Sequence, residues 1–198
     1  MKHGLTVYAI DIEHLASIYG CRDENLILAV HRYYHQNNRQ KVKYSDQEVK
    51  ILQAFVQIVN GETLNENYSA VYAAAIQLYC TAFKSELLEN APFHPCSHTW
   101  LKEIDQTLEE IGIIQDFRLS ELISGKLPLP IPESNKFISF GHVSTVAAYQ
   151  AFNQLRYEDY MSADNNMIEA IACLKRWLHY VSSAFEAGNN LGLVGFYY

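Results

Sequence analysis

The two ends of the chain place the strongest limit on how it can fold. Residues 4–10 and 191–197 are short, apolar and rich in β-branched or aromatic side chains, a composition typical of β-strands. A third segment of this kind covers residues 137–142. We expect these N-terminal, central and C-terminal strands to meet in one small, mainly antiparallel sheet of about three strands.

Helical patterns fill the long stretches between the strands. The clearest covers residues 164–187, where apolar side chains recur at alternating steps of four and three from Met167 to Phe185 and form one buried stripe. Further helices are expected over residues 11–20, 23–36, 45–60, 67–89, 98–111 and 145–155, with a short helical turn at 119–123. Strands separated in this way predict an α+β fold, with six to seven helices packed on the sheet.

Capping residues mark several of these helix starts. An N-cap side chain accepts hydrogen bonds from the free N–H groups of the first helical turn, and Asp11, Asp23 and Ser144 are placed to do so. Ser45 and Glu48 have the spacing of a capping box. Ser144 also follows a strand, as the nucleophile of a hydrolase elbow does, but the second glycine of that motif is missing. Capping therefore explains Ser144 better.

Length and charge limit the class of protein. The chain has 198 residues, which suits a single domain, and 49% of them are hydrophobic, which argues against disorder. The net charge of −7 repels nucleic acid and anionic membranes, so neither is an expected partner. No apolar run approaches the roughly 20 residues that would span a bilayer.

The cysteines indicate a reducing compartment. Cys21, Cys80, Cys96 and Cys173 are far apart, and none belongs to a CxxC pair. Isolated cysteines of this kind behave as small hydrophobic residues. The first residues lead directly into the predicted strand, so we expect no signal peptide and a cytoplasmic location.

One loop has metal-ligand residue types. His94, Cys96 and His98 alternate just before a predicted helix, and all three side chains can bind zinc or a similar metal. Structural zinc sites usually draw ligands from two separate clusters, and a second cluster is missing here. The alternative is a helix-entry loop whose histidines form hydrogen bonds with backbone carbonyls.

Aromatic residues suggest a second kind of site. The chain has 14 tyrosines, and Tyr72, Tyr79 and Trp100 could line a small-molecule pocket, although they are equally good core residues. No glycine-rich phosphate-binding loop occurs, so no cofactor is expected. Adjacent carboxylates on a helix point apart, so they make no catalytic pair. The sequence therefore identifies no catalytic residues.

The order of these parts resembles that of the YfbM-like group of uncharacterised bacterial proteins. The resemblance rests on residues 5–11, on 127–132 followed by 137–144, and on a long helix containing Leu174–Leu178 before Gly188 and a terminal strand. It implies an α+β sandwich and a cytoplasmic bacterial protein. Because the group has no assigned activity, the resemblance implies no functional residue.

We therefore expect a non-enzymatic binding or protein-interaction domain, with a partner protein or a second copy of the chain as ligand. Its basis is the abundance of tyrosine, which is enriched at contact surfaces, together with the lack of a catalytic motif. The alternative is a metal-dependent hydrolase, or another metal-binding protein, that uses His94, Cys96 and His98.

Overall fold

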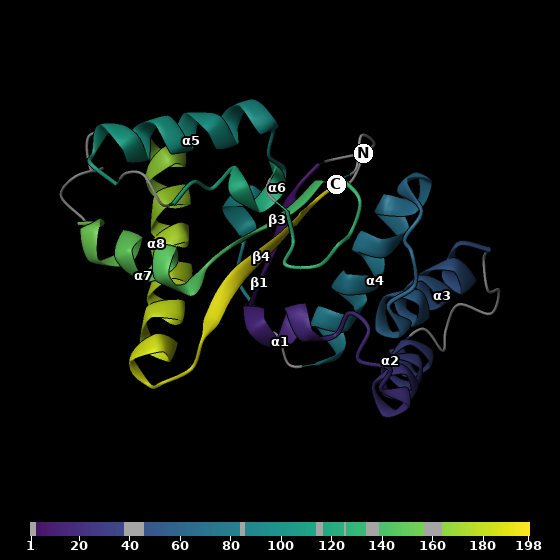
Figure 1. Cartoon of the computed structure of the whole chain (residues 1–198). Coiled ribbons are helices and arrows are strands. Elements are labelled where there is room, and N and C mark those ends of the chain that lie inside the picture. The colour runs from purple at the N-terminus through teal and green to yellow at the C-terminus, as the bar shows by residue number, and fades with distance from the viewer. Residues whose placement is uncertain are drawn as a thin grey trace. The chain divides into compact units, whose positions relative to one another are not determined.

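A computed structural model confirms that the chain has an α+β fold (Figure 1). It describes residues 3–37, 46–83, 86–113, 117–124, 126–133, 139–156 and 164–198. The predicted capping box at Ser45 lies outside these residues.

Four strands of the described chain form one antiparallel sheet. They are β1 (Leu5–Asp11), β2 (Glu86–Leu87), β3 (Ser139–Val143) and β4 (Leu191–Tyr197), in the order β2-β1-β4-β3. Leu5 pairs with Tyr197 and Asp11 with Leu191, so the two ends of the chain run along the centre of the sheet. The prediction that the N-terminal, central and C-terminal strands share one sheet is confirmed.

The strand β2 was not predicted, and the helix expected over residues 67–89 is wrong only after Ala82, in its last residues. The helix ends at Ala82, and Tyr8 and Ala9 of β1 pair with Leu87 and Glu86. The unpaired backbone groups at the edge of β1 require a partner, and this requirement overrides the good helix propensity of Glu86 and Leu87, since intrinsic propensity is weaker than tertiary context.

The helices otherwise follow the sequence pattern closely. The described part contains α1 (Ile12–Ser17), α2 (Glu24–Asn37), α3 (Asp46–Asn60), α4 (Ser69–Ala82), α5 (His98–Glu110), α6 (Glu121–Ser124), α7 (Thr145–Gln154) and α8 (Asn165–Glu186), with short 3-10 helices at Glu66–Tyr68 and Ala91–Phe93. Asp23 caps α2, since its carboxylate accepts from the backbone N–H of Asn25 at 2.8 Å. Ser144 caps α7 by accepting from Ala147 N at 3.2 Å, as predicted.

The chain divides into two compact units. Unit 1 contains Met1–Ile12, Glu86–Leu127 and Ser139–Tyr198, and unit 2 contains Glu13–Ser85 and Pro128–Ile138. Each unit is assembled from segments that are distant in the sequence, so no linker marks a boundary between them. The prediction of a single domain stays a prediction.

Unit 1 holds the sheet, and α5, α7 and α8 lie on one side of it (Figure 1). The long helix α8 buries an apolar face that includes Ile171, Leu174, Trp177 and Leu178. These residues share one core with strand residues such as Leu193. Burial of this stripe is the main reason why the segment forms a helix of 22 residues.

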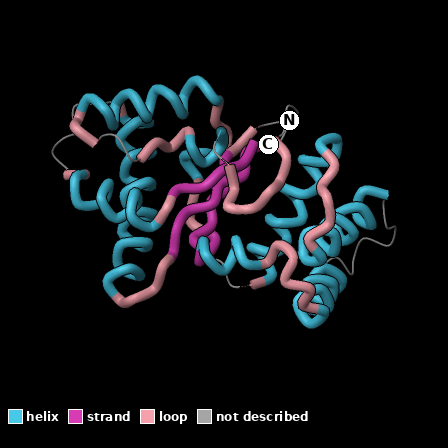
Figure 2. The backbone as a smooth tube through the Cα atoms, viewed as in Figure 1, coloured by secondary structure: helices cyan, strands magenta, loops and turns pink. Residues whose placement is uncertain are grey.

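Unit 2, as far as it is described, consists of helices and loops (Figure 2). Its core includes Phe55, Ile58, Tyr72, Ile76 and Tyr79, which are all at most 1% exposed. No helix in the described ranges combines the length and the apolar character that a bilayer crossing requires.

Candidate binding groove

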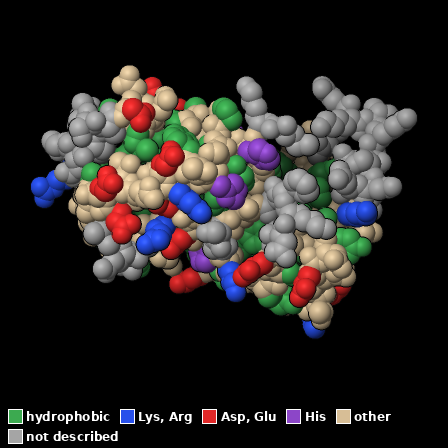
Figure 3. Space-filling model, turned by 90° about the horizontal axis from the view of Figure 1, so that it is seen from above, with side chains coloured by type: hydrophobic (Ala, Val, Ile, Leu, Met, Phe, Trp, Pro, Cys, Tyr) green, Lys and Arg blue, Asp and Glu red, His purple; other side chains and the backbone are tan. Residues whose placement is uncertain are grey.

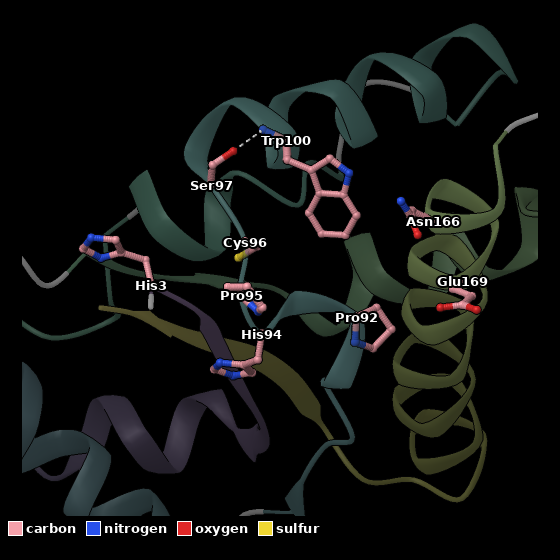
Figure 4. A pocket seen from close by; sticks show the side chains of 9 residues that line it. All are labelled: His3, Pro92, His94, Pro95, Cys96, Ser97, Trp100, Asn166 and Glu169. Carbon is pink, nitrogen blue, oxygen red and sulfur yellow. Dashed lines mark hydrogen bonds between the residues drawn. The ribbon is translucent and has the colours of Figure 1, made fainter. Parts of the chain in front are cut away.

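An open groove on unit 1 is the strongest candidate for a functional site (Figure 4). Its volume is about 700 Å³, which falls within the usual range for ligand sites. Nine residues line it, namely His3, Pro92, His94, Pro95, Cys96, Ser97, Trp100, Asn166 and Glu169. We call this the α5–α8 groove, because those two helices provide one of its sides.

The floor of the groove is built from a segment that follows the edge of β1. After β2, the backbone N–H of Leu88 donates to Val7 O at 3.0 Å, and that of Cys96 donates to His3 O at 3.0 Å. Between these two points the side chain of Asn90 donates to Leu5 O at 2.7 Å. The loop thus continues the strand pairing that β2 begins, which fixes the groove lining against the sheet.

Asn90 also orients His94. Its amide nitrogen lies 3.0 Å from His94 Nε2 while donating to the Leu5 carbonyl. Since an amide NH₂ group only donates, the imidazole accepts at Nε2 and carries its proton on Nδ1. The ring packs against the backbone of Gly4, where a Cβ atom would come within 1.8 Å of Nδ1. Both ring nitrogens therefore face this chain's own atoms.

Tyr197 supports the groove from the sheet. Its hydroxyl donates to the Cys96 carbonyl at 3.2 Å, and its ring stacks on His3 with centroids 5.9 Å apart. The ring of His98 packs edge-on against the same tyrosine at 4.4 Å. The last strand residues thereby hold the loop that carries the groove residues.

Two helix starts provide the other side of the groove. Ser97 caps α5 by accepting from Trp100 N, which places the indole one turn inside the helix. Asp164 caps α8 by accepting from Asn166 N and Met167 N. Asn166 and Glu169 are three residues apart on α8, so their side chains share one face of the helix.

Burial controls the ionisation of several of these groups. It raises the pKa of the Cys96 thiol to about 11, although a hydrogen bond with the Leu5 backbone opposes the shift. Burial also raises the pKa of Tyr197, with a further contribution from Cys96. The pKa of His98 is lowered by burial first, and then by the positive charges of Lys102 and His3.

The formal charge of the groove lining is negative when the histidines are neutral. No lysine or arginine is present among the nine lining residues, so Glu169 carries their only formal charge when the histidines are neutral. Its carboxylate makes no ion pair within the described part of the chain. Outside the groove lining, the surface over α5 and its neighbours carries both acidic and basic side chains (Figure 3).

Comparison with known proteins places the whole chain in one family. The model of the domain of unknown function DUF7691 matches residues 1–198. The chain belongs to the DUF7691 family. No curated protein and no solved structure matches it. The resemblance to the YfbM-like group is not supported by these comparisons.

The structure does not bring the predicted metal ligands together in this DUF7691 protein. His94 contacts Asn90 and Gly4, His98 packs on Tyr197, and no three His, Cys, Asp or Glu side chains of the described residues are grouped closely enough to hold a metal ion. The spacing His94-x-Cys96-x-His98 is compatible with metal binding, but the loop uses these residues to join the sheet edge to α5.

The predicted aromatic pocket is divided between the two units. Trp100 lines the α5–α8 groove of unit 1, whereas Tyr72 and Tyr79 belong to the core of unit 2. Tyr72 donates to Gln57 Oε1 at 3.0 Å and accepts from Asn65 N at 3.2 Å, and Tyr79 stacks on neighbouring rings of its own unit. A pocket that uses all three residues stays a prediction.

Sequence reasoning missed His3, Pro92, Asn166 and Glu169 as groove residues. The only local signal was a polar pair, Asn166 and Glu169, spaced for one face at the start of an otherwise apolar helix. Such pairs are common on the solvent side of helices. Only the tertiary structure brings Asn166 and Glu169 to the same groove as the side chain of Trp100.

The alkylation rates of the cysteines test the raised pKa of Cys96. Because the thiolate is the reactive form, the raised pKa of Cys96 predicts slow alkylation at pH 8 and a rate that keeps rising toward pH 11. Cys21 is exposed, whereas Cys80 and Cys173 are buried. We expect Cys21 to react first with iodoacetamide, as followed by peptide mass spectrometry. Alkylation of Cys96 at the rate of Cys21 would contradict this assignment.

Proposed function

We propose that this protein is a non-enzymatic binding protein whose α5–α8 groove holds a segment of a partner protein. The observation that carries the proposal is an open groove of about 700 Å³ with a tryptophan on one side and prolines along its base. Tryptophan is among the residues that contribute most to protein–protein binding.

The exposure of the lining favours a protein segment over an enclosed small molecule. His3, His94, Ser97, Asn166 and Glu169 are exposed, and Trp100 is half-buried. Small ligands usually bind in clefts that remove most of their surface from water. A groove with accessible walls instead suits a chain that continues beyond both ends of the site.

The loop that forms the floor of the groove is tied to the sheet by hydrogen bonds. The loop is held by backbone hydrogen bonds from Leu88 and Cys96, by the side chain of Asn90 and by the hydroxyl of Tyr197. Preorganisation of this kind lowers the entropic cost of binding.

The Cys96 thiol, with its pKa near 11, is mostly protonated at neutral pH and so fits a wall position better than the role of a nucleophile.

The test is selection from a random peptide library displayed on phage, using the full-length chain as bait. We expect enriched peptides whose affinity, measured by calorimetry, falls about tenfold or more in Trp100→Ala, as for a hot-spot residue. Because Trp100 also packs on Phe93 at 5.6 Å, a second variant, Asn166→Trp, fills the groove from an exposed position and should weaken binding similarly.

Tyr180→Ala is the matched control, since Tyr180 is an exposed aromatic residue of α8 outside the groove lining. It should leave the affinity unchanged. The proposal fails if no peptide is enriched. It also fails if the enriched peptides bind Trp100→Ala and Asn166→Trp as tightly as they bind the unmodified protein.

A further inference from the structure

We infer that the group recognised in the α5–α8 groove is the guanidinium of an arginine side chain in the bound segment. This inference rests on the proposed function and names the chemistry of its ligand. The inference is based on three side chains that line the same side of the groove, namely the indole of Trp100, the carboxylate of Glu169 and the amide of Asn166 (Figure 4).

These three side chains come from two helices and face the same space. The indole of Trp100 extends from α5 on the side where Asn166 and Glu169 project from α8, and Pro92 lies below it (Figure 4). His3 and His94 lie at the opposite end of the groove. A side chain that enters beside Trp100 can therefore contact the indole and the carboxylate together, while its backbone continues toward the histidines.

The charge of the groove selects a cation. An aromatic face attracts positive charge, and the adjacent carboxylate does the same. Glu169 has no cationic partner among the described residues, and no lysine or arginine lines the groove. The two helix starts could attract an anion, but Ser97 and Asp164 already cap them, and Asp164 adds a negative charge close by.

The geometry favours arginine over lysine. A guanidinium is planar, so it can stack on the indole while its edge donates two parallel hydrogen bonds to a carboxylate. It retains further N–H donors for the Asn166 carbonyl oxygen. An ammonium group is a strongly hydrated point charge that cannot stack in this way. Exposed charges alone add little affinity, so stacking on Trp100 is required for the preference.

The experiment uses four randomised peptide pools that differ only in a fixed central residue, which is arginine, citrulline, lysine or glutamate. Citrulline has the shape of arginine without its charge. We expect the arginine pool to bind the full-length chain about tenfold more tightly than the citrulline pool. In Glu169→Gln this preference should largely disappear, and in Glu169→Arg the glutamate pool should bind best.

Glu186→Gln is the matched control, because Glu186 is an exposed carboxylate of the same helix outside the groove lining. It should keep the arginine preference intact. Equal binding of the arginine and citrulline pools, or a preference that survives in Glu169→Gln, overturns the inference. Equal binding of the lysine and arginine pools overturns the choice of a guanidinium.

Two further results separate this inference from the proposed function. Peptides that bind in a Trp100-dependent manner without an arginine preference would leave the binding groove in place and remove only the ligand assignment. If no pool binds, both fail. Blocked free arginine, N-acetyl-arginine amide, is the last arm, and binding as tight as that of the peptides would identify a small-molecule site and overturn the assignment to a protein segment.

Discussion

We expect Trp177→Ala to lower the free energy of unfolding by about 3–5 kcal/mol, the range for truncation of a large buried aromatic residue. Trp177 is 1% exposed in the core of unit 1, and its ring lies 4.8 Å from that of Phe93. Its indole N–H also donates to the Glu89 carbonyl at 2.5 Å. The substitution removes both the packing of α8 and an anchor of the segment that leads to the groove.

Urea unfolding followed by circular dichroism measures this change. If Trp177→Ala does not fold, Trp177→Phe provides the test, because it keeps an aromatic ring and loses the N–H, for an expected cost of about 1–3 kcal/mol. Tyr180→Ala, at a 41% exposed position of the same helix, should stay within about 0.5 kcal/mol of the unmodified protein. Equal effects at Trp177 and Tyr180 would show that Trp177 does not anchor the core.

Trp177 also illustrates how much of the fold could be predicted. The apolar stripe of residues 164–187 identified α8 to within one residue at each end, because burial of a helix face leaves a periodic pattern in the sequence. The predicted caps Asp23 and Ser144 are similarly local signals, since a capping side chain acts on the N–H groups two or three residues later. The terminal strands were also predicted from a local signal, which is the β-branched and aromatic composition of residues 4–10 and 191–197.

The parts that sequence reasoning missed depend on contacts between distant residues. β2 exists because the edge of β1 needs a partner, and nothing within Glu86–Leu87 itself indicates this pairing. The groove depends on His3, Trp100 and Glu169, which come from three separate regions of the chain. The metal interpretation of His94, Cys96 and His98 stays a prediction: their spacing suggested it, and in the structure His94 contacts Asn90 while His98 contacts Tyr197.

A glycine in the last strand gives the second large effect. We expect Gly195→Val to lower the free energy of unfolding by more than about 3 kcal/mol, beyond the usual cost of overpacking, and Gly195→Ala to have a smaller effect in the same direction. A Cβ at this position would come within 2.6 Å of both the Cβ and the carbonyl oxygen of Leu122 in α6. Thermal and urea unfolding of both variants would measure the loss.

Two effects of opposite sign compete in Gly195→Ala, and their magnitudes decide the outcome. Alanine lowers the entropy of the unfolded chain and should stabilise a strand by about 0.5–1 kcal/mol relative to glycine. Against this, the new methyl group meets the backbone of α6, which cannot yield as a flexible side chain would, at a cost of about 1–3 kcal/mol. Leu87→Ala, at a 57% exposed position of β2, is the control and should change little. A Gly195→Ala protein at least as stable as the unmodified one would mean that α6 moves away from β4 at little cost, and that this close approach does not hold the sheet and helix together.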